Sequence, residues 1–98
     1  MINIVDFKQS VIDARLPAEL PLHLQALWHD GAGNWKAAHD LIDQLTDQQS
    51  AHIHAYLHRK EGDIWNADYW YKRAGKSRPH VSLEEEWEML VKEYFQLQ

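Results

Sequence analysis

Cysteine is absent from this chain of 98 residues, which excludes disulfide bonds and any metal site built on thiolates. Long apolar runs are absent too, since no run approaches the roughly 18 residues that a membrane-spanning helix requires. The N-terminus lacks the basic and apolar pattern of a secretory signal. We therefore expect a cytoplasmic protein that has no contact with a membrane.

An excess of positive charge is also missing, because 15 acidic residues outnumber 10 lysines and arginines and give a formal net charge of −5. Such a chain has no general attraction to phosphate backbones, so the sequence argues against nucleic-acid binding. The local exception is a basic stretch made of Lys72, Arg73, Lys76 and Arg78. We interpret these cations as complements to the dipole at the end of a helix. The alternative is a contact with an acidic patch of a partner or with RNA phosphates, with Trp65 and Trp70 stacking on the bases.

A self-match at a spacing of 29 residues organises the middle of the chain. The segment HLQALWHDGAGNWKAAHDLI, at 23–42, aligns without a gap with HIHAYLHRKEGDIWNADYWY, at 52–71. The match pairs His29 with His58 and Gly33 with Gly62. A fixed period of this size is typical of repeat proteins, whose units bury their faces against each other.

Each repeat unit has the pattern of a helical hairpin. Apolar residues recur at helical spacing on both sides of Gly33 and of Gly62, and glycine can end a helix in a left-handed conformation without steric cost. Ser82 and Glu85 form a capping box before a final amphipathic helix. Since two repeats are fewer than such arrays usually need, that helix and an N-terminal apolar segment must complete the core. The apolar residues of this segment are Ile4, Phe7, Val11 and Ile12.

The hydrophobic content of 45% is too high for a disordered chain, and the length suits one domain with one modest core. We predict an all-α fold of five to six helices in a single domain, 1–98. Its parts are an N-terminal segment at 1–18, hairpin repeats at 19–47 and 48–79, and a C-terminal capping helix at 80–98.

The second repeat unit resembles the second half of a tetratricopeptide repeat. The residues that carry this resemblance are Gly62, Asp63, Ala67, Tyr71, Ala74 and Pro79. The first unit matches the same pattern more loosely through Gly33, Asn34, Trp35, Ala38, Ile42 and Leu45. The resemblance implies a right-handed stack of antiparallel hairpins whose first helices line a concave groove. The sequence is also similar to small helical proteins that are common in bacteria.

The resemblance implies a non-catalytic module that binds a protein or peptide in this groove. The expected groove residues are His23, Leu27, Asp30, His52, Tyr56, Arg59 and Lys60. Tyr56 would supply apolar area, and Arg59 and Lys60 would bind a carboxylate of the partner. Alternatively, His23 and His52 pack beneath the terminal helices. A second hypothesis is a self-associating structural protein, in which a homodimer supplies the missing core, and a third is a metal-binding or RNA-binding protein.

Four aromatic or apolar residues of the second unit fall into two classes. Tyr71, Trp70 and Ile64 align with apolar residues of the first unit, so we predict that they belong to the core. Trp65 aligns instead with Lys36, a residue expected in solvent. Trp65 is therefore either an exposed anchor for a partner or a residue that packs against the C-terminal helix.

Seven histidines raise the question of a metal site. His54 and His58 stand four residues apart on one helical face, a spacing that can present two imidazoles to zinc, but the sequence offers no evident third ligand. We therefore expect structural histidines, no metal and no cofactor. No serine nucleophile or glycine-rich phosphate loop completes a catalytic site, so the protein is not expected to be an enzyme.

Overall fold

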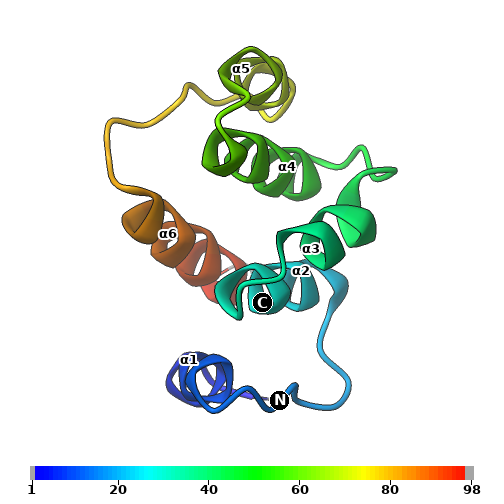
Figure 1. Ribbon diagram of the computed structural model, residues 1–98, viewed down its shortest axis with the longest axis vertical. Coiled ribbons are helices and arrows are strands. Elements are labelled where there is room, and N and C mark those ends of the chain that lie inside the picture. The colour runs from blue at the N-terminus through cyan, green and yellow to red at the C-terminus, as the bar shows by residue number, and fades with distance from the viewer. Residues whose placement is uncertain (1, 97–98) are drawn as a thin grey trace.

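Residues 2–96 are described by a computed structural model, and in this range they form six α-helices and no β-strand (Figure 1). The helices are α1 (Ile4–Ile12), α2 (Leu22–Gly31), α3 (Trp35–Ile42), α4 (Gln48–Glu61), α5 (Ile64–Arg73) and α6 (Leu83–Gln96). The predicted all-α class and the predicted helix number are confirmed. Within the described residues, no helix combines the length and the apolar character that crossing a membrane requires.

The turn between α2 and α3 and the turn between α4 and α5 have the same geometry. Gly33 and Gly62 both adopt φ +89°, and their amides donate to the carbonyls three residues earlier at 3.0 Å and 3.1 Å. The next residues cap the following helices, since the side chains of Asn34 and Asp63 accept backbone hydrogen bonds at 3.1 Å and 3.2 Å. An L-residue with a Cβ is strained at this φ, which explains glycine at both places. The sequence match at 29 residues is therefore also a match of local structure.

The core lies where α6 returns across α2 and α4 and meets α1. Figure 1 shows α6 between α1 and α4, although it follows α5 in the chain. The largest buried cluster combines residues of α1, α2, α3, α4 and α6, including the fully buried Phe7, Leu24, Ile42, Leu57 and Val91. The N-terminal segment and the last helix thus complete the core, as the sequence predicts.

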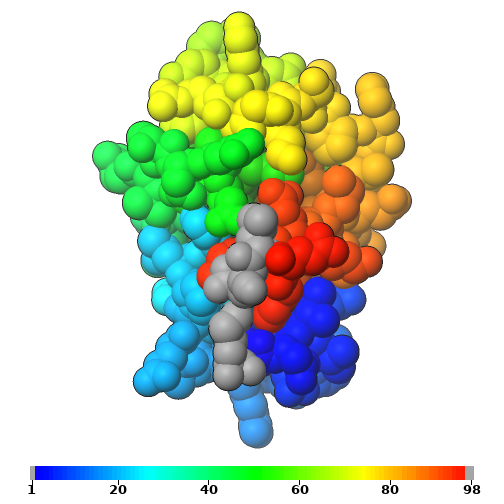
Figure 2. All heavy atoms as spheres, turned by 180° about the vertical axis from the view of Figure 1, so that it is seen from behind, coloured from blue at the N-terminus to red at the C-terminus, as the bar shows by residue number. Residues whose placement is uncertain are grey.

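Helix α5 stands at the edge of this arrangement. It packs on α4, where Ala67 and Tyr71 form a separate small cluster with Ala55. The space-filling view places α5 and the loop after it at one end of the molecule and α1 at the opposite end (Figure 2). One side of α5 therefore faces solvent.

Two residues predicted to lie in the core lie at the surface instead. Ile64, the first residue of α5, is 36% exposed. Ile12 is 76% exposed because it is the last residue of α1 and borders an open hollow. Tyr71 is buried and Trp70 is half-buried, as expected for residues that pack against α4.

Candidate functional site

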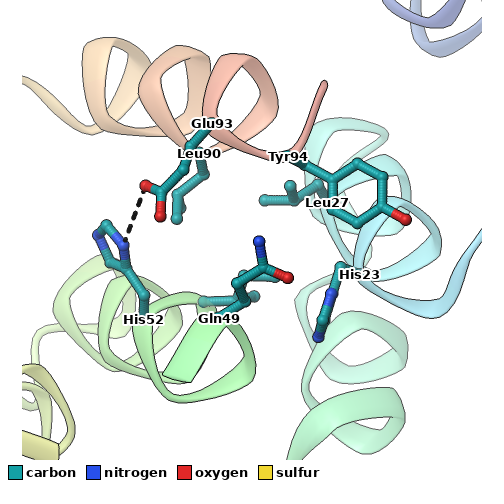
Figure 3. Close-up of a pocket in the computed structure, with 8 residues that line it drawn as sticks. His23, Leu27, Gln49, His52, Leu90, Glu93 and Tyr94 are labelled. Carbon is teal, nitrogen blue, oxygen red and sulfur yellow. Dashed lines mark ion pairs between the residues drawn. The ribbon is translucent and has the colours of Figure 1, made fainter. Parts of the chain in front are cut away.

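The concave face of α2 and α4, where the groove was expected, is covered by α6. Figure 3 shows His23 and Leu27 from α2 and His52 from α4 facing Leu90, Glu93 and Tyr94 from α6. The cavity left between them has a volume of about 10 Å³. This is about the space of one water molecule, so no side chain of a peptide fits there.

Most of the predicted groove residues are buried by this contact. Leu27, Asp30, His52 and Tyr56 are between 1% and 6% exposed. The structure brings three of the seven residues together in one interaction, since the Asp30 carboxylate accepts from the Tyr56 hydroxyl at 2.7 Å and from Lys60 Nζ at 2.9 Å. At the other end, His23 lies 2.8 Å from the Ser50 hydroxyl. The polar side chains that were predicted to bind a partner thus form hydrogen bonds within the chain.

Glu86 of α6 is the centre of a buried polar network that the sequence reasoning missed. Its side chain is 0% exposed and accepts from Arg59 Nη1 at 2.8 Å and from the Tyr71 hydroxyl at 2.6 Å and 2.7 Å. His52 Nε2 lies 3.4 Å from the same carboxylate. Burial alone would raise the pKa of this carboxyl, but the hydrogen bonds from its three partners outweigh burial and hold the pKa below its ordinary value.

A sequence signal for Glu86 did exist. The residue comes three positions after Leu83 and four before Leu90, so it lies on the apolar face of its helix. Its acidic neighbours in the first turn, Glu84 and Glu85, make the helix dipole an alternative explanation for Glu86. A carboxylate within an apolar stripe indicates a buried ionic contact instead, because a buried charge requires partners.

One end of the predicted groove remains open. A hollow of about 510 Å³ lies among α1, α2, α4 and α6, where Asp30, Tyr56 and Lys60 meet Ile12 and Trp87. Lys60 is the only one of the seven predicted residues that is exposed. The remainder of the predicted groove is filled by α6.

The outer side of α5 exposes aromatic and basic side chains. Trp65 is 81% exposed and does not pack against α6, and Tyr69 is 47% exposed. The guanidinium of Arg73 lies over the rings of Tyr69 and Trp70, at 5.8 Å and 5.2 Å from their centroids. We call Trp65, Tyr69, Lys72 and Arg73 the α5 outer face, because helical spacing places all four on the solvent side.

Three histidines from two helices come together beside α5. His39 of α3 joins His54 and His58 of α4, and one ring nitrogen from each lies within 4.8 Å of the others. His54 and His58 are 4% and 7% exposed, and the Nε2 atoms of His39 and His54 are 3.1 Å apart. We call these residues the histidine cluster. The third imidazole that the sequence did not reveal is His39.

Burial, reinforced by the neighbouring His58 and His39, lowers the pKa of His54 to about 4. In the unfolded chain the same imidazole takes up a proton near pH 6.5, so the unfolded state binds more protons between pH 6.5 and 4. The stability due to neutral His54 is fully present above this window and is lost as the pH falls through it.

We expect metal-free protein to be about 2 kcal/mol less stable at pH 5 than at pH 7. Urea unfolding at both pH values in the presence of a chelator measures the difference. In His54→Gln, which cannot titrate, most of this difference should disappear. An equal pH dependence in the two proteins would contradict the assignment to His54.

The chain matches no known family model, and comparison with the curated proteins and with solved structures gives no significant match. The resemblance to tetratricopeptide repeats therefore rests on the residues of this chain alone.

Proposed function

We propose that the protein is a non-catalytic interaction module of tetratricopeptide-like hairpins that binds another protein through the α5 outer face. The observation that carries this proposal is the 81% exposure of Trp65 beside Tyr69 on that face. Tryptophan and tyrosine supply large contact areas at low entropic cost and are enriched among the residues that dominate binding energy. A tryptophan held in water by a folded scaffold is best explained by a partner that covers it.

The arrangement of the helices supports the choice of α5. Repeat arrays need terminal elements that cover the exposed face of the last unit. Here the C-terminal helix α6 packs on α2, α4 and α1, and its link to α5 is the bond between Tyr71 and Glu86. The last hairpin therefore keeps an uncovered outer face. The two turns of equal geometry at Gly33 and Gly62 support the hairpin repeat itself.

Binding in the predicted groove is the less favourable form of the proposal. A peptide could occupy it only if α6 left, and that would expose the buried Glu86 network. Of the predicted groove residues at the open end, only Lys60 is exposed, and its ammonium already bonds to Asp30 at 2.9 Å. The α5 outer face needs no such rearrangement.

The charge of the α5 outer face indicates an acidic partner segment. Lys72 and Arg73 lie on it, and the exposed Lys76 follows in the next loop. The rest of the chain is acidic, so this is a local basic surface on a protein of net charge −5. Carboxylates flanking an apolar group in the partner would bond to these cations while the apolar group contacts Trp65.

Self-association through the same face is the second candidate. Exposed aromatic area favours it, but a two-fold dimer places the same patch of each copy face to face. The cations Lys72 and Arg73 of both copies would then be gathered in one interface, and like charges oppose such a contact. A different protein with acidic residues is the better fit.

Replacement of Trp65 by lysine tests the proposal. The repeat counterpart Lys36 is exposed on α3, so we expect Trp65→Lys to stay folded, with a stability change within about 0.5 kcal/mol. In affinity purification from the native host, we expect a partner that is recovered with the wild type and lost with this variant. Val5→Lys is the matched control, because Val5 is 71% exposed on the distant α1, and it should keep the partner.

Two outcomes would contradict the proposal. If the wild type, Trp65→Lys and Val5→Lys all recovered the same proteins, the α5 outer face would not be the binding surface. A wild-type dimer in sedimentation that becomes a folded monomer in Trp65→Lys would establish self-association instead.

A further inference from the structure

We propose that His39, His54 and His58 form a binding site for a divalent transition metal, with Zn²⁺ as the ion that suits it best. Three imidazoles are a ligand set typical of zinc, and they also suit copper and nickel. The site is separate from the α5 outer face, so this inference goes beyond the proposed function. It reverses the expectation of no metal, which depended on the missing third ligand.

The distances within the histidine cluster match those around a bound ion. Zinc binds imidazole nitrogen at about 2.0–2.1 Å, which places two ligand nitrogens of a tetrahedral site about 3.3 Å apart. The Nε2 atoms of His39 and His54 already lie 3.1 Å apart. One ring nitrogen from each of the three residues lies within 4.8 Å of the others. Side-chain rotations that shift these nitrogens by about 1 Å would bring all three within bonding distance of one ion.

Aromatic neighbours hold two of the three imidazoles in place. The Trp35 ring stacks on His39 with centroids 4.9 Å apart, and the Trp70 ring stacks on His54 at 4.0 Å. Trp35 is itself fixed by a hydrogen bond from its Nε1 to the Leu57 carbonyl at 2.7 Å. A site whose ligands are already ordered loses less entropy when the ion binds.

The third imidazole has the carboxylate contact typical of a metal ligand. His58 Nδ1 lies 2.6 Å from the Glu61 carboxylate. A carboxylate that accepts from one ring nitrogen leaves the other nitrogen unprotonated and makes it a better ligand. A carboxylate oxygen of Asp43 lies within 4.8 Å of a ring nitrogen of His39, and both carboxylates offset the charge of an ion.

A purely structural role explains the cluster less completely. One hydrogen bond can form between the Nε2 atoms of His39 and His54, and in it one ring donates and the other accepts. Each neutral imidazole has one N–H donor, so the three largely buried rings have only three ring protons for hydrogen bonds. A single cation would give their lone pairs a common partner, and it would tie α3 to α4 at the junction of the two repeats.

The test is titration of untagged, chelator-treated protein with ZnCl₂ in a calorimeter. We expect saturable binding of one equivalent and a rise in melting temperature, because the ion binds the folded state. Titration with Cu²⁺ should quench the fluorescence of Trp35 and Trp70, which stack on the ligands, and the quenching should saturate at one equivalent.

Two ligand variants and one control make the result specific. His39→Ala and His58→Gln, each checked for helicity by circular dichroism, should bind Zn²⁺ at least about tenfold more weakly. His29→Ala is the matched control, because His29 is the repeat counterpart of His58 and lies outside the cluster, and it should bind as the wild type does. Absence of saturable binding to the wild type would overturn the proposal. Equal binding by the wild type and the folded ligand variants would do the same.

Discussion

Replacement of Glu86 by alanine is expected to lower the free energy of unfolding by about 3–5 kcal/mol, because it leaves buried polar groups without their acceptor. The Arg59 side chain is only 17% exposed and bonds to Glu86 at 2.8 Å. The Tyr71 hydroxyl bonds to both oxygens of the same carboxylate. For a domain of this size, the loss is a large part of the total stability. Urea unfolding followed by circular dichroism measures it.

Two further variants sharpen this result. Glu86→Gln keeps an acceptor oxygen but removes the charge, so we expect a smaller loss than with alanine. Glu84→Ala changes an exposed residue of the same helical turn and should have an effect within about 0.5 kcal/mol. If Glu86→Ala and Glu84→Ala were equally stable, the network would not hold α6 on the rest of the fold.

The network also limits how binding can be tested. Arg59→Glu would place a second carboxylate beside the buried Glu86 and destabilise the fold, so loss of a partner in that variant would not locate the binding surface. Variants of the α5 outer face are free of this problem because those side chains lie in solvent.

Replacement of Phe7 by alanine is the second change with a large expected effect, about 3–5 kcal/mol. Phe7 is 0% exposed, and its ring lies 6.2 Å from the Trp87 ring and 6.0 Å from the Phe95 ring, measured between centroids. These contacts join α1 to α6. Removal of the ring leaves a cavity at this junction and weakens the contact that α6 needs to stay over α2.

Chemical unfolding of Phe7→Ala beside Val5→Ala tests this expectation. Val5 is in the same helix but 71% exposed, so its truncation should change the stability by no more than about 0.5 kcal/mol. Equal midpoints for the two variants would show that α1 contributes little to the core. If the two variants differed only in the hydrogen exchange of the amides that exchange first, α1 would detach without global unfolding.

The sequence by itself determined the local structure. Gly33 and Gly62 adopt the left-handed backbone conformation, and helices end at both glycines, as the repeat match predicts. The Ser82 half of the capping box also forms, since the Glu85 amide donates to the Ser82 hydroxyl at 3.0 Å, while the Glu85 carboxylate accepts from that hydroxyl. These features depend on residues within a few positions of each other, so the pattern of side chains is enough to specify them.

Only the tertiary structure decided what each helix packs against. The apolar stripe of α6 predicts a buried helix, but it does not say that the helix lies over the face of α2 and α4 where a partner groove was expected. The same contact buries Glu86 beside Arg59, and the packing of α3 on α4 brings His39 to His54. Amphipathic periodicity specifies which side of a helix avoids water, whereas the neighbour on that side depends on how all the helices pack together.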